Sequence, residues 1–134
     1  VMKGNIASSR VGTVIYNRGV ASAIIIAEAI HIAHKKFGVG PVGGTEFRWA
    51  MENFDLTSER IAELGATGLV PPFKLSCDDH EGSGKAQFQQ WDGSKWVQIE
   101  SWMEPYSEIT KPMIAASSAQ YAEEKGITPR CGLD

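Results

Sequence analysis

The sequence lacks any apolar run long enough to cross a membrane. A spanning helix needs about 18 or more consecutive apolar residues, and the richest segment, 20–37, is interrupted by charged side chains such as Glu28 and Lys35. Basic residues are not in excess either, because 13 Lys and Arg stand against 16 Asp and Glu, for a formal net charge of −3. Nucleic-acid binding favours a basic face, so the charge gives no case for a nucleic-acid partner.

Motifs of common enzyme classes are also missing. The sequence contains no nucleophile elbow, no phosphate-binding glycine loop and no zinc-protease helix. Ser83 between Gly82 and Gly84 is typical of a flexible turn. No internal repeat and no signal peptide is visible, although a mature or truncated product would lack the signal peptide too. The lack of these motifs favours a protein without catalysis.

Cysteine is scarce, with only Cys77 and Cys131. Three interpretations stay open for the pair: a disulfide, two buried thiols, or chance. Without a signal peptide, the sequence alone favours reduced thiols.

The composition is that of a soluble globular domain. With 134 residues, 43% apolar and 22% charged, the chain suits one modest domain or a fragment of something larger. Its most informative stretch is 77–102, in which aromatic runs at 88–91 and 96–99 flank an Asp-Gly turn. That pattern predicts a β-hairpin, because glycine accepts the positive φ that such turns demand.

A long helix is predicted early in the chain. A β-prone run at 11–16 is followed by a helix from Asn17, its predicted N-cap, to Phe37. Val20, Ile24, Ala27 and Ile30 recur at helical spacing and predict its buried face. Glu28, His31 and His34 also align, which would suit metal ligands, but a solvated edge is favoured.

Helix-capping residues, together with prolines and glycines that interrupt helices, predict the remaining elements. Thr45 is predicted to open a second helix, Thr57 to cap a third, and 73–76 to form a strand. Thr110 is predicted to cap the last helix, with Pro112 in its first turn and Gly126 at its end. The predicted inner face of that helix consists of Met113, Ile114, Ser117 and Tyr121. This order of elements predicts an α/β fold with too few strands for a full doubly wound sheet.

Two places suggest a site. His80 between Asp79 and Glu81 would suit calcium or zinc, but the spacing fits no known loop, and a turn whose charges bind local N–H groups is favoured. Tyr16 and Asn17 are the better candidates, because α/β folds bind ligands beyond the carboxyl end of a strand.

Several separate motifs resemble one known family over nearly all of residues 11–131. They are 14–19 (VIYNRG), 28–30 (EAI), 69–77 (LVPPFKLSC), 79–82 (DHEG), 89–93 (QQWDG) and 125–130 (KGITPR). Together they resemble the C-terminal portion of the branched-chain amino acid type of periplasmic solute-binding protein of ABC transporters. The resemblance implies a partial type I periplasmic-binding-protein (Venus-flytrap) fold: a three-layer αβα lobe fragment with a C-terminal β-hairpin and helix.

The resemblance also implies an organisation and a role. Residues 1–10 would be a linker or tail, 11–84 the C-terminal part of lobe 1, and 85–134 the return into lobe 2. The implied function is a receptor that delivers an amino acid or a related carboxylate, aromatic ones included, to an ABC permease, without catalysis, cofactor or metal. This chain would be a fragment that does not bind the ligand alone. Its partners would be that ligand, the membrane permease and the remaining N-terminal portion of the same polypeptide, and no nucleic acid.

The implied ligand contacts lie near the predicted strand-to-helix junction, at Val14, Tyr16 and Asn17, with Val11 also within reach. The implied periplasmic location is oxidising, and on that ground a disulfide between Cys77 and Cys131 is expected. Two alternatives are a ligand-sensing regulatory domain of the same fold and a metal-dependent enzyme using His80 and its acidic neighbours.

Overall fold

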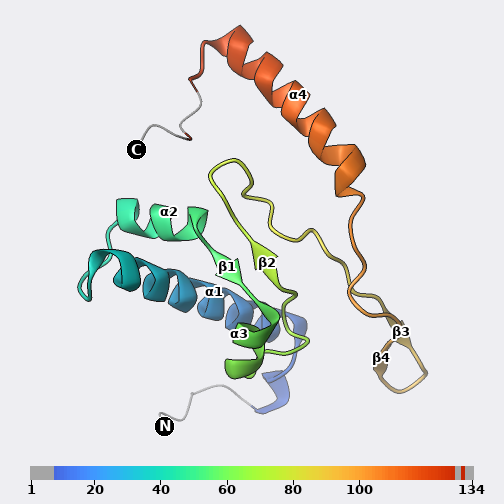
Figure 1. Ribbon diagram of the computed structural model, residues 1–134. Coiled ribbons are helices and arrows are strands. Elements are labelled where there is room, and N and C mark those ends of the chain that lie inside the picture. Colours follow the sequence, from blue (N-terminus) through green and yellow to red (C-terminus); the bar gives the residue numbers. More distant parts are fainter. Residues whose placement is uncertain (1–7, 129–130, 132–134) are drawn as a thin grey trace. The chain divides into compact units, whose positions relative to one another are not determined.

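The chain forms two compact units, Val1–Ser76 and Cys77–Asp134. A computed structural model describes residues 8–128 and Cys131, and Figure 1 follows them along the chain. Each unit is described by itself below. The predicted division into 1–10, 11–84 and 85–134 stays a prediction.

The first unit is built from three helices and a short two-stranded sheet (Figure 1). A 3-10 turn precedes the first helix, and the two strands pair antiparallel with Leu56 opposite Phe73. The elements are the turn Ser8–Arg10, α1 Val14–Phe37, α2 Gly44–Glu52, β1 Asp55–Leu56, α3 Ser58–Glu63 and β2 Phe73–Lys74.

Helix α1 begins earlier than predicted, and the predicted strand at 11–16 is wrong. Thr13, not Asn17, is the N-cap, and its hydroxyl accepts a hydrogen bond from the Tyr16 N–H at 3.4 Å. The β-branched residues at the start of the run favour strand, but such a preference is weak beside a cap and tertiary packing. Asn17 lies inside the helix, where its Nδ2 donates to the Gly12 carbonyl at 3.3 Å.

The buried face of α1 is also rotated from the predicted one. Ala29 and Ala33 are fully buried, whereas Ala27 of the predicted face is exposed and Ile24 is only half-buried. The α2 helix packs against α1, and Ala50 of α2 is buried with these alanines. Small side chains at the contact allow the two helices to approach closely.

The core of this unit lies between the helices and the small sheet. Phe54 and Leu56 are its largest fully buried side chains, and the Phe54 ring stacks on Phe73 with centroids 5.2 Å apart. The Leu75 N–H donates to the Phe54 carbonyl at 2.9 Å, which extends the contact beyond β2. Strand β1 was not predicted, and the predicted strand 73–76 is ordered as β2 only over its first two residues.

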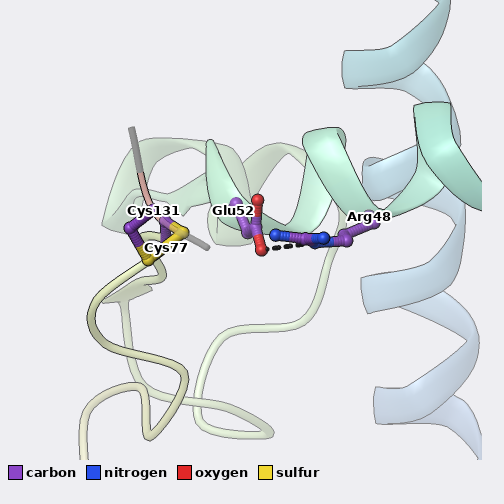
Figure 2. Close-up of a disulfide and its surroundings, with 4 residues drawn as sticks. All are labelled: Arg48, Glu52, Cys77 and Cys131. Atoms are coloured by element: carbon purple, nitrogen blue, oxygen red, sulfur yellow. Dashed lines mark hydrogen bonds and ion pairs between the residues drawn. A yellow bond between two sulfur atoms is a disulfide. The ribbon is translucent and has the colours of Figure 1, made fainter. Parts of the chain in front are cut away.

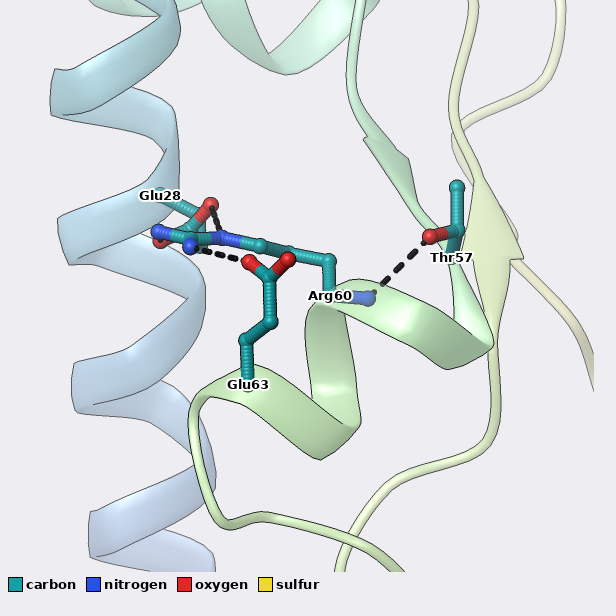
Figure 3. A network of polar contacts seen from close by, with 4 residues as sticks. All are labelled: Glu28, Thr57, Arg60 and Glu63. Atoms are coloured by element: carbon teal, nitrogen blue, oxygen red, sulfur yellow. Dashed lines mark hydrogen bonds and ion pairs between the residues drawn. The ribbon is translucent and has the colours of Figure 1, made fainter.

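A partly buried ion pair joins α1 to α3 (Figure 3): the Glu28 side chain is largely covered, and the Arg60 side chain is half-exposed. Two nitrogens of the Arg60 guanidinium donate to the two carboxylate oxygens of Glu28, at 2.9 and 2.7 Å, and a third contact reaches Glu63 at 2.8 Å. Thr57 caps α3 as predicted, accepting from the Arg60 N–H at 3.2 Å. The prediction that Glu28 lies on a solvated edge is wrong, because its carboxylate faces this guanidinium.

The second unit contains the predicted hairpin. Strands β3 Gln89–Trp91 and β4 Trp96–Gln98 pair antiparallel with Trp91 opposite Trp96, and the two indole rings lie 5.7 Å apart. Asp92 organises the turn by accepting from the N–H groups of Ser94 and Lys95. These bonds lower the Asp92 pKa, because they stabilise its charged form.

The last helix, α4 Ser107–Lys125, differs from prediction at its start and in its surroundings. It begins at Ser107 rather than after Thr110, so Pro112 lies inside the helix instead of in a first turn. None of its residues is buried, and the predicted inner face is exposed. Gly126 ends the helix in the left-handed conformation, as predicted.

The predicted fold class is therefore corrected. The structure is mostly helical with two small antiparallel two-stranded sheets, and it is not a three-layer αβα Venus-flytrap lobe fragment. The physical reason is that the expected first strand became the first turn of α1. In the described residues, each sheet then pairs only two short antiparallel strands, and a parallel layer has no strands to build it.

We expect Leu56→Ala to lower the free energy of unfolding by about 2–5 kcal/mol, because it leaves a cavity in a well-packed core. Val39→Ala is the matched control, since Val39 is 91% exposed. Urea denaturation measures both variants. Equal midpoints for the two would contradict the core assignment.

The Glu28–Arg60 pair predicts a pH dependence. Hydrogen bonding to Arg60 lowers the pKa of Glu28 below its ordinary value of 4.5. The pair thus stabilises the fold fully above that value, and this contribution is lost as the pH falls below 4.5 through the lowered folded pKa. We expect the wild type to have a higher free energy of unfolding than Glu28→Gln at pH 6. This difference should shrink as the pH falls from 6 to 3, because protonation of Glu28 removes the ion pair. Parallel stability profiles would refute the assignment.

Candidate functional site

A hollow of about 610 Å³ lies at the start of α1. We call it the α1 hollow. Its walls are largely aliphatic, with one guanidinium, one threonine hydroxyl and one phenol. The lining residues are Arg10, Thr13, Ile15, Tyr16, Gly19, Val20 and Ala23.

Local sequence positions these side chains. Gly12 adopts a φ of 83°, a left-handed conformation that glycine takes without steric cost, and the turn places Thr13 as the cap of α1. From there, Tyr16, Val20 and Ala23 follow at spacings of four and three residues, which brings them to one side of the helix. The Thr13 hydroxyl donates to the Arg10 carbonyl at 2.8 Å, so Thr13 ties the preceding turn to the helix.

This arrangement suits binding better than catalysis. The aliphatic wall would hold an apolar body, and the Arg10 guanidinium offers the planar donors that match a carboxylate. Within the part of the chain that the structure describes, no histidine or carboxylate lines the hollow as a general base for the Thr13 or Tyr16 hydroxyl.

The structure brings one of the predicted ligand residues to this hollow. Tyr16 lines it, whereas Val11 and Val14 do not and are 54% and 69% exposed. Asn17 is turned to the Gly12 carbonyl. The predicted ligand-binding role of these four residues stays a prediction. Arg10 and Thr13 were not predicted, although a threonine before an apolar helical run is a recognisable cap signal.

A second, smaller hollow of about 350 Å³ lies in the other unit, at the acidic turn. Asp79 forms an ion pair with Lys111 of α4 and accepts from the Glu81 N–H at 3.1 Å. Lys111 is the main cause of the lowered pKa of Asp79, and Asp79 in turn raises the pKa of Lys111. The predicted turn with charges bound to local N–H groups is therefore present. Lys111 was missed because it lies 32 residues away.

Neither of the two residue groups considered as metal ligands, Glu28 with His31 and His34 or His80 with its acidic neighbours, forms a metal site. Among residues 8–128 and 131, no group of three or more His, Cys, Asp or Glu side chains is arranged to hold a metal ion. Glu28 is engaged by Arg60, and the His34 Nε2 lies 2.9 Å from the Gly40 carbonyl oxygen.

Cys77 and Cys131 are joined by a disulfide, with their Cα atoms 5.5 Å apart (Figure 2). This is the pair that was expected on the ground of an oxidising location. The bond closes a loop with a sequence separation of 54, which contains the hairpin and α4. Figure 2 also shows the ion pair within α2 between Arg48 Nε and Glu52 Oε1, at 2.7 Å.

Comparison with solved structures finds a relative among ABC transporter proteins. It is described as "The crystal structure of abc transporter permease from pseudomonas fluorescens group", and it shares 39% sequence identity and a TM-score of 0.87 with this chain. The match covers 94% of this chain and 30% of the other, so this chain spans less than a third of that protein. No family model matches the sequence, and no curated protein matches it significantly.

These findings correct the predicted identity. The relative is described as a permease, so the predictions of a periplasmic solute-binding protein, a receptor function and a regulatory sensor of the same fold are contradicted. The relationship to an ABC transporter stands. In the described residues, no helix combines the length and the apolar character needed to span a bilayer.

The disulfide predicts a measurable loss of stability on reduction. Breaking the bond returns conformational entropy to the unfolded chain, which for a loop of this length lowers the free energy of unfolding by about 4 kcal/mol. We expect denatured, unreduced protein to show no reactive thiols, and reduced protein to unfold at a clearly lower urea concentration. Cys77→Ser/Cys131→Ser should match the reduced wild type. Two reactive thiols per chain before reduction would contradict the bond.

Proposed function

We propose that this chain is a portion of an ABC transporter protein and acts in transport without catalysing a reaction of its own. The observation that carries the proposal is the match to the ABC transporter permease structure, which extends over 94% of this chain at 39% identity. At that identity, similarity over a whole stretch indicates common ancestry and not only a shared architecture.

The proposed location is the periplasm. Persistent disulfides form in oxidising compartments and are rare in the cytosol. The Cys77–Cys131 bond supports such a location.

The proposed partners are the other subunits of the transporter and a small ligand carrying a carboxylate. The α1 hollow supports the ligand class, because it combines Arg10 with the aliphatic side chains of Ile15 and Val20. A guanidinium beside an apolar wall is suited to a molecule with an acidic group and an apolar body.

Co-purification tests the transporter proposal. We would isolate the full-length protein that contains this chain, affinity-tagged in its native host, after mild cross-linking of intact cells. We expect an ATPase subunit carrying the G-x-x-x-x-G-K-[ST] phosphate loop among the recovered proteins, identified by mass spectrometry. An unrelated disulfide-containing protein with the same tag is the control. Recovery of the ATPase at the control level would contradict the proposal.

A further inference from the structure

The acidic turn, residues 78–81, is linked to both ends of helix α4 within the second unit. One link runs from the turn to the start of the helix through a short antiparallel pairing. The Ala86 N–H donates to the Met103 carbonyl oxygen at 3.2 Å, and the Met103 N–H donates to the Ala86 carbonyl oxygen at 2.8 Å. The other link is the disulfide, because Cys77 directly precedes the turn and Cys131 follows α4. The helix is therefore attached at both ends.

The attachment at the start of α4 includes contacts that do not involve the disulfide. Lys85 Nζ lies 2.6 Å from Glu104 Oε1 in an ion pair. Gly84 adopts a φ of 58°, and a Cβ at this position would lie 3.2 Å from Pro105 Cγ, so glycine allows the chain to pass close to the proline. Backbone bonds, an ion pair and this close contact together fix the start of the helix.

The middle of α4 faces the acidic turn across the smaller hollow of about 350 Å³, which we call the turn hollow. Its walls are the four residues of the acidic turn and, from α4, Lys111, Ile114, Ala115 and Ser118. The Lys111–Asp79 ion pair spans the two walls, but both side chains are in solvent, where such a pair adds little to stability. The attachments at the ends of α4 therefore matter more for this wall than the ion pair does.

We propose that α4 is a redox-sensitive strap over the turn hollow. While the Cys77–Cys131 bond is intact, the strap is closed, because the bond keeps Lys111 at a high effective concentration beside Asp79. Reduction frees the far end of α4, and the helix then leaves the acidic turn by moving about its attached start. The turn hollow loses one wall, and the carboxylates of the turn become open to solvent.

The step that frees the strap is a thiol–disulfide exchange with a dithiol. A thiolate of the dithiol attacks one sulfur of the Cys77–Cys131 bond, which breaks and leaves a mixed disulfide with that cysteine. The second thiolate of the dithiol then displaces this cysteine. Two cysteine thiolates leave and take up the two protons that the dithiol has lost, and the dithiol is oxidised to its own disulfide.

The opening is local, because the hairpin has contacts of its own. Strands β3 and β4 pair with each other, and the Ala86–Met103 pairing closes the base of the hairpin without either cysteine. A strap therefore differs from a general staple, whose loss would loosen the whole unit. The proposal rests on neither the transport role nor the ligand class, so it can fail while the co-purification result stands, and the reverse is equally possible.

Hydrogen–deuterium exchange of the folded full-length protein tests the strap. Dithiothreitol is the dithiol, added without denaturant. We expect peptides from 107–125 and 78–83 to exchange about tenfold faster after reduction, and peptides from 88–99 to change by less than about twofold. Unchanged exchange in α4, an equal increase in the hairpin, or a bond that dithiothreitol leaves intact in the folded protein would each overturn the proposal.

Cys77→Ser/Cys131→Ser is the redox-inert control. Its α4 peptides should exchange fast whether or not dithiothreitol is present, because the strap is free in both conditions. A response to dithiothreitol that persists in this variant would show that the reagent acts elsewhere, and the proposal would be wrong. The wild type folds before its bond is reduced, so the main comparison does not depend on the folding of the variant.

Amine labelling gives a second readout at Lys111. Only an unprotonated amine reacts with an N-hydroxysuccinimide ester, and Asp79 raises the pKa of Lys111 while the strap is closed. We expect reduction to raise the labelling rate of Lys111 by about threefold or more, since the pair is then broken. Lys95 is the matched control, because it is an exposed lysine outside α4, and its rate should not change. A constant rate at Lys111, or an equal rise at Lys95, would contradict the release of α4.

Discussion

The first unit depends on a carboxylate that it could not bury without a partner. Glu28 is 8% exposed and lies directly before the buried Ala29, so the side of α1 that meets the core carries a charge with it. Burying an unpaired carboxylate costs several kcal/mol, and removal of one partner of such a pair is strongly destabilising. Arg60 meets both carboxylate oxygens, and this bidentate geometry fixes the rotation of α1 relative to α3.

Local signals in the sequence predicted the local features well. The Asp-Gly turn, the Thr57 cap and the Gly126 helix end each depend on a residue and its near neighbours, and each is present. The buried face of α1 was mispredicted for the opposite reason. That face contacts Arg60, 32 residues after Glu28, and also packs on α2, and an aliphatic helix with isoleucine on several sides has no single periodic stripe to reveal it. Strand β1 was missed because two residues carry too little alternation to detect.

The same holds for the candidate site: features that depend on nearby residues were predictable from the sequence, and contacts between distant residues were not. Tyr16 was picked as a ligand residue from an expected strand-to-helix junction, and it lines the α1 hollow although the junction is a capped turn. Arg10 and Lys111 were missed, because a surface cation gives no sign of the group that it will face. The motifs placed the chain among ABC transporter proteins, but short matching segments do not identify the component to which they belong. The match to a structure described as a permease, which covers 94% of this chain, corrects the predicted component.

The second unit raises a question of stability that its own contacts do not answer. Its hairpin has two strands, which is marginal in water without a covering layer, and all six of its strand residues are exposed. Its helix has no buried residue, and the Lys111–Asp79 pair lies in solvent, where an ion pair adds little to stability. The disulfide restricts the unfolded chain, but it adds no apolar burial to the folded one. Apolar burial is the main favourable term in folding, and β3, β4 and α4 supply little of it to this unit, so the loop closed by the disulfide is the main restraint that its own residues provide.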